Sequence, residues 1–128
     1  MTTSSSDSPP VAAMAEQDVR AAFPAALPAV RGLQHCALAV YGRLEPERAL
    51  NWTLEELGEL AQAVRRHEGR DRVHEELGQL TAWMLCLANI LGADLADAIE
   101  SAISEEIDRQ LAKYGKLTPY QPGRQPDD

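Results

Sequence analysis

The chain has 128 residues, of which 45% are hydrophobic and 25% charged, a balance typical of one globular domain with its own core. Its net charge of -8 excludes general nucleic-acid binding, because that function needs a basic surface. The first ten residues lack the basic and apolar segments of a secretory signal, and the longest apolar run, 80–91, is too short to span a bilayer, so we expect no membrane partner.

Residues 1–28 are predicted to form a disordered N-terminal tail. They open with serines, threonines and prolines, and Pro24 and Pro28 interrupt the residues that follow. Residues 11–23 could form a short helix, but an unstructured leader is the better interpretation of this composition. A helical domain is therefore predicted for residues 29–115, followed by a proline-rich, flexible C-terminal tail at residues 116–128.

Four helices are predicted between the tails, because apolar residues recur at three- and four-residue spacing and no strand-like alternation is present. The first covers residues 30–41, and the second runs from about residue 47 or 51 to 68, with Thr53 as an internal cap where the helix bends and restarts. The third is capped by Asp71, and the fourth runs from its cap, Asp94, to the glycine at 115. The predicted fold class is all-α, a four-helix bundle unit.

The third helix is apolar on nearly every side from Leu80 onwards. A helix of that kind is normally central and buried, and the other helices of one chain offer too little surface to cover it. We therefore expect oligomerisation to complete the bundle, as a homodimer or homotetramer. Cys36 and Cys86 lie in apolar helical runs and are predicted to be buried, reduced thiols, which favours a cytoplasmic location.

Two similar acidic turns occur in the second and third helices, namely Glu55-Glu56-Leu57-Gly58-Glu59-Leu60 and Glu75-Glu76-Leu77-Gly78-Gln79-Leu80. Residues three apart share a helix face, so Glu56 stands with Glu59, and Glu76 with Gln79. If the two helices pack antiparallel, these four oxygen-bearing side chains meet. The pattern predicts a site for Mg²⁺, with Mn²⁺ as a possible substitute. A solvated acidic face is the alternative and is favoured for Glu55.

The acids Glu55-Glu56-x-x-Glu59, followed about twenty residues later by Glu76-x-x-Gln79 and then by Leu87-Ala88-Asn89, resemble the MazG-like all-α nucleoside triphosphate pyrophosphohydrolases. The resemblance covers about residues 33–114. It implies an enzyme that hydrolyses a nucleoside triphosphate, NTP or dNTP, to the monophosphate and pyrophosphate, with Mg²⁺ as the cofactor.

The resemblance also implies roles for individual residues. Glu56, Glu59 and Glu76 would be metal ligands, and Glu55 would be a further ligand or orient the attacking water. Asn89 would face the nucleotide, with a buried amide bonded to a neighbouring helix as an equal alternative. Lys113 would reach the phosphates, although its place in a last helical turn, where cations suit the helix dipole, explains it as well.

The chain departs from the family pattern at Gln79, where the family has Asp. A glutamine offers a neutral carbonyl oxygen, which is a weaker ligand for Mg²⁺ than a carboxylate. Two alternative functions therefore stay open. One is a catalytically weakened or inactive module for nucleotide binding or protein interaction, and the other is a plain helical dimerisation domain whose acids are solvated.

Overall fold

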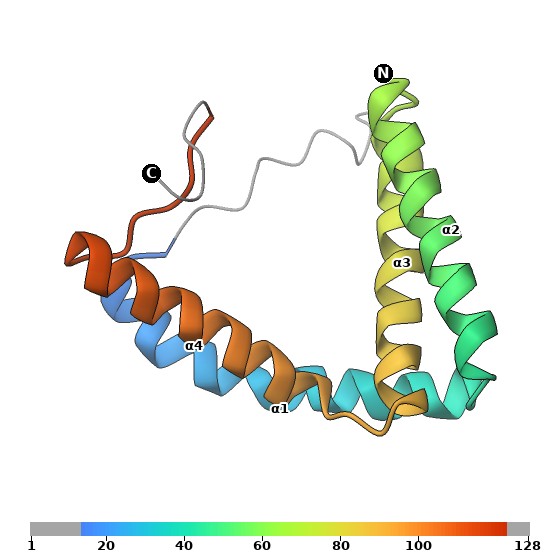
Figure 1. The fold of residues 1–128 in the computed structure, drawn as a ribbon, viewed down its shortest axis with the longest axis horizontal. Helices are drawn as coiled ribbons and strands as arrows, with labels where there is room; N and C mark the ends of the chain where they lie inside the picture. The colour runs from blue at the N-terminus through green and yellow to red at the C-terminus, as the bar shows by residue number, and fades with distance from the viewer. Residues whose placement is uncertain (1–13, 123–128) are drawn as a thin grey trace, which may run out of the picture.

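The computed structural model describes residues 14–122. Within them it contains no strand and four helices, namely α1 (Glu16–Tyr41), α2 (Pro46–Arg65), α3 (Arg70–Ile90) and α4 (Leu95–Tyr114). The helices form two arms: α2 and α3 pack antiparallel in one, and α1 runs along α4 in the other and crosses the base of α3 (Figure 1). The predicted all-α class is confirmed, and the α2–α3 hairpin places the two acidic turns side by side.

The first helix is longer than the sequence predicts. The expectation of a disordered tail is wrong for residues 16–28, because α1 begins at Glu16 and contains Pro24 and Pro28. A proline inside a helix removes a backbone hydrogen bond and costs about 3 kcal/mol. Packing offsets this cost, since Leu27 is buried and this half of α1 lies along α4 (Figure 1). The rest of the predicted tail, residues 1–13, lies outside the described residues.

Two of the predicted helix-capping signals are wrong. The N-cap of α3 is Gly69, with φ of 99°, and Asp71 lies inside the first turn. Thr53 lies within an uninterrupted α2, where its hydroxyl donates a hydrogen bond of 2.8 Å to the carbonyl of Ala49. Inside a helix, a Thr hydroxyl can donate its hydrogen bond to the carbonyl four residues earlier, so the capping-box spacing alone does not mark a helix start.

The described part of the predicted flexible C-terminal tail, residues 116–122, is anchored to α4. The hydroxyl of Tyr120 donates a hydrogen bond of 2.9 Å to Glu106. Arg109 binds the same carboxylate through two hydrogen bonds of 2.8 Å, and Gln110 donates a fourth hydrogen bond to it. Together Arg109, Gln110 and Tyr120 lower the pKa of Glu106 to about 2. The segment after α4 is therefore held against that helix at Tyr120, through the hydrogen bonds that converge on Glu106.

The apolar stripe of α2 does not face α3. α2 instead buries its small residues, Ala49 and Ala63, which lets the two helices approach closely. Leu54, Leu57 and Val64 are 65%, 50% and 55% exposed. On α3, large apolar side chains such as those at positions 77 and 84 are also about half exposed. One chain therefore leaves a broad apolar surface uncovered, in line with the expected excess of apolar surface on α3.

The two cysteines are both free thiols but differ in exposure. Cys86 is buried, and burial raises the pKa of its thiol. Cys36 is exposed, so the prediction that both are buried is wrong for Cys36, because the described helices leave its side of α1 uncovered.

Among the described residues, no single helix is long and apolar enough to cross a membrane. The pair formed by α3 and α4, which is bent by 109°, has the length and the composition of a broken membrane span, and length and composition are the only criteria that it meets.

Candidate metal centre

Three acids meet at the seam between α2 and α3. Glu56 and Glu59 come from one turn of α2 and Glu76 from the second turn of α3. One carboxylate oxygen of each lies within 4.8 Å of the others. The structure therefore brings together the three carboxylates that the sequence predicts as ligands, in the antiparallel arrangement that the prediction requires.

Two oxygens of this cluster are buried without a partner. Glu76 is only 1% exposed, and its Oε1 accepts a contact of 2.6 Å from Nη1 of Arg72. Its other oxygen, Oε2, has no hydrogen-bond partner among the described residues, and the same holds for Oε2 of Glu56. A buried carboxylate oxygen without a partner costs free energy. A hard divalent cation would remove this cost, so the donor set fits Mg²⁺ or Mn²⁺.

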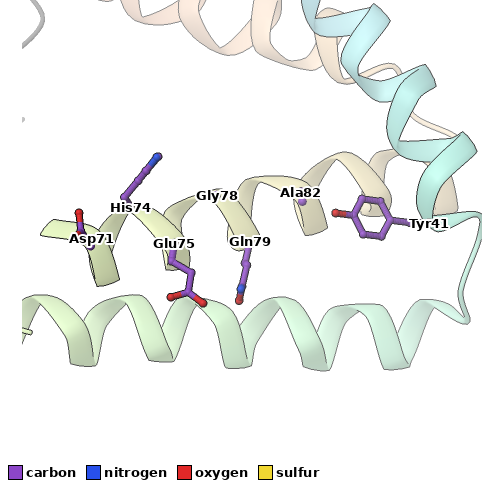
Figure 2. Close-up of a pocket in the computed structure, with 7 residues that line it drawn as sticks. All are labelled: Tyr41, Asp71, His74, Glu75, Gly78, Gln79 and Ala82. Atoms are coloured by element: carbon purple, nitrogen blue, oxygen red, sulfur yellow. The ribbon is translucent and has the colours of Figure 1, made fainter. Parts of the chain in front are cut away.

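Gln79 lies at the edge of the cluster and is exposed, as is Glu75. Both line an open hollow of about 420 Å³, whose other lining residues are Tyr41, Asp71, His74, Gly78 and Ala82. Figure 2 shows the side chains of Glu75 and Gln79 pointing toward α2, whereas that of His74 points away. Gln79 thus lies where its neutral oxygen borders this hollow (Figure 2).

An aromatic group lies at the other end of the hollow. The rings of Trp52 and Trp83 meet edge to face with centroids 5.0 Å apart, and the ring of Tyr41 lies 6.2 Å from that of Trp83. Trp52 is one turn before Glu56 on α2, so the aromatic group and the acids share one seam. The first predicted helix ends at Tyr41, but the sequence does not indicate that this side chain lines the hollow, since the crossing of α1 over the hairpin is not a local feature.

Asn89 lies about 20 Å further along α3 than Glu76, in a buried polar network. Its Oδ1 accepts a hydrogen bond of 3.1 Å from Nε2 of Gln34, and its Nδ2 donates one of 3.0 Å to the carbonyl of Gln34. Gln34 also donates to the carbonyl of Ala93 and accepts from the N–H of Leu95, both at 2.8 Å. Both ends of the Asn89 amide are occupied, as in the alternative of a buried amide bonded to a neighbouring helix.

Two further predicted site residues lie outside the three-acid cluster. Glu55 is exposed, but it stands four positions before Glu59, so the two are neighbours on one face of α2. Lys113 belongs to the last turn of α4, at the tip of the other arm (Figure 1), with its Nζ 5.4 Å from the ring centre of Tyr114. Within one chain, Lys113 is remote from the acids, so the fold does not bring it to the three-acid cluster (Figure 1).

The family model of the MazG nucleotide pyrophosphohydrolase domain matches residues 44–112, more than half of the chain. The chain belongs to the MazG family. The match contains α2 and α3 complete and most of α4, and therefore all three clustered acids. It confirms the family that the acidic turns suggest. Searches of curated proteins and of solved structures give no significant match.

Proposed function

We propose that this MazG domain is a Mg²⁺-dependent pyrophosphohydrolase that converts an NTP or dNTP to the monophosphate and pyrophosphate. Family membership supports the reaction class. The observation that carries the proposal is the pair of buried, unpartnered oxygens on Glu56 and Glu76, with Glu59 within 4.8 Å. A protein rarely buries such oxygens unless a ligand satisfies them.

In this reaction, the residues of the chain would have separate roles. Glu56, Glu59 and Glu76 would hold the cation at the seam, and Gln79 would add a neutral oxygen at the edge. Bound Mg²⁺ would neutralise phosphate charge and acidify a water molecule. Glu55, exposed beside Glu59, would accept the proton of the water that attacks the α-phosphorus, or serve as a further ligand.

The hollow beside Gln79 would take the remainder of the substrate. Its volume of about 420 Å³ lies within the range of small-molecule sites. Tyr41 lines it and stands next to the Trp52–Trp83 pair, so an aromatic surface is available for a base. Asn89 is left out of this proposal, because its amide is already bonded at both ends to Gln34.

We also propose that the active form is a homo-oligomer, either a dimer or a tetramer. Leu54, Leu57 and Val64 form an exposed apolar row on α2, and Leu77 lies beside Val64 in an apolar groove between α2 and α3. A monomer rarely exposes such a continuous surface. A second copy covering this face would complete the bundle, and Lys113 of that copy would be able to approach the phosphates.

The test is a panel of NTPs and dNTPs incubated with the full chain and Mg²⁺ or Mn²⁺, with pyrophosphate as the readout. Glu56→Gln and Glu59→Gln each remove one charged ligand at nearly constant volume, so we expect at least about 100-fold lower kcat/KM. Glu105→Gln, which removes an exposed acid of α4, is the matched control and should keep wild-type activity.

Two other results would support the alternative functions. Absence of turnover together with nucleotide-dependent thermal stabilisation would favour an inactive nucleotide-binding module. Absence of both would favour a plain dimerisation domain, with the acids of the seam as a structural feature only. A cytoplasmic location stays a prediction under each of these outcomes.

A further inference from the structure

A positively charged side chain already belongs to the acidic cluster. Arg72 lies one turn before Glu76 on α3, and its Nη1 is 2.6 Å from Oε1 of that residue. The same guanidinium lies 3.3 Å from Glu75 and 3.8 Å from Glu68. The Arg72 side chain is 40% exposed, whereas that of Glu76 is 1% exposed. The ion pair thus connects the most buried carboxylate of the centre to a cation at the protein surface.

The arginine and a metal ion would use different oxygens of the same carboxylate. Arg72 takes Oε1 of Glu76, and Oε2 is left without a partner among the described residues. Binding of a cation at Oε2 therefore does not require the guanidinium to leave. The positive charge of Arg72 would stay beside the incoming cation and oppose it.

The charges around the centre oppose one another. Glu56, Glu59 and Glu76 contribute three negative charges and Gln79 contributes none, whereas Arg72 contributes one positive charge that it shares with Glu75 and Glu68. Arg72 therefore lowers the net negative charge that the three acids offer to a cation. With a carboxylate at position 79, the same site would hold one negative charge more and would favour additional positive charge.

We propose that Arg72 is a built-in counter-ion of the metal centre, which holds Glu76 in place and lowers the affinity of the centre for a divalent cation. The inference rests on the proposed function only in treating the three acids as a metal centre. Arg72 is a positioning residue, because it acts through Glu76. A purely structural ion pair would change the stability of the protein but not the affinity of the centre for metal.

The test is calorimetric titration of the full chain with Mn²⁺ and with Mg²⁺ at fixed ionic strength, without nucleotide. Arg72→Gln should bind the ion about five- to tenfold more tightly, because a unit charge next to the site has been removed under strong solvent screening. Arg72→Lys keeps the charge and should stay within about twofold of wild type.

Arg20→Gln is the matched control, since Arg20 also pairs with an acid four residues away, Glu16, but on α1. The Arg20→Gln variant should bind the metal with the same affinity as wild type. Arg72→Met, which keeps the aliphatic stem, provides a second neutral variant if Arg72→Gln does not fold. In either neutral variant, the metal-induced rise in Tm should be larger than in wild type.

Unchanged or weaker metal binding in the neutral variants would overturn the role of Arg72 as an opposing charge. Loss of turnover on every nucleotide, combined with tighter metal binding by Arg72→Gln, would overturn the catalytic proposal and leave this inference standing. Failure of the wild-type chain to bind either metal would overturn both.

Discussion

The pair formed by Gln34 and Asn89 joins α1 to α3 and provides a quantitative test of the fold. Asn89→Ala removes hydrogen bonds of 3.1 and 3.0 Å at a side chain that is 8% exposed. It also leaves the carbonyl of Gln34 without its side-chain partner. A buried hydrogen bond contributes about 1 kcal/mol net, and an unsatisfied buried group costs about 1–3 kcal/mol. We therefore expect the free energy of unfolding to fall by about 2–4 kcal/mol.

Urea denaturation followed by circular dichroism measures this change, with all variants at one protein concentration because association shifts apparent stability. Gln34→Ala and the double variant complete a cycle, whose coupling energy should reach about 1 kcal/mol or more. Gln62→Ala, at an exposed glutamine of α2, should change stability by less than about 0.5 kcal/mol. A similarly small effect of Asn89→Ala would refute the network and would restore Asn89 as a candidate for nucleotide contact.

Three further predictions concern the edge of the centre, the apolar face and the anchored tail. Gln79→Asp adds a carboxylate beside the acids and should tighten Mg²⁺ binding about fivefold or more in calorimetry; weaker binding would place Gln79 outside the coordination shell. Leu54→Glu puts a charge on the exposed face of α2 and should reduce the molar mass measured by light scattering, whereas an unchanged mass would exclude this face from the interface. The pKa of Glu106 is lowered to about 2 in the folded chain, from an ordinary 4.5, so its carboxylate adds stability above about pH 5 that is lost as the pH falls toward 2. The Tm difference between wild type and Glu106→Gln should therefore shrink as the pH falls from about 6 to 3, and a constant difference would contradict the Arg109 network.

The sequence predicts the hairpin and its acids well because both depend on local signals. Helical spacing sets α2 and α3, and a short turn near Arg66 forces the two helices to run antiparallel. Glu59 lies six residues before the end of α2 at Arg65, and Glu76 lies six residues after the start of α3 at Arg70, so the turn itself brings them opposite each other. The cluster of three acids could therefore be predicted without knowledge of any contact between distant parts of the chain.

The features that the sequence does not predict depend on how α1 crosses the other helices. Pro24 and Pro28 indicate a helix break locally, but packing along α4 keeps the helix intact. Asn89 is a lone amide in an apolar run, and its sequence does not reveal that Gln34 will be its partner. The same crossing brings Tyr41 to the hollow. Each of these outcomes requires the relative placement of elements far apart in the chain.

The α2–α3 hairpin reverses the usual preference for apolar residues inside and charges outside. It buries Glu76 completely and leaves Leu54 and Leu57 half exposed or more. Full burial of a leucine side chain stabilises a protein by about 1.5–3 kcal/mol, so a single chain that leaves this row exposed lacks several kcal/mol of stabilisation. The acids of α2 and its leucine row occupy different faces of the helix, since Glu56 lies about 200° around from Leu54. In the proposed function, a cation would bind the acidic face and a second copy of the chain would cover the leucine row, so metal binding and self-association would act on separate faces of the same hairpin.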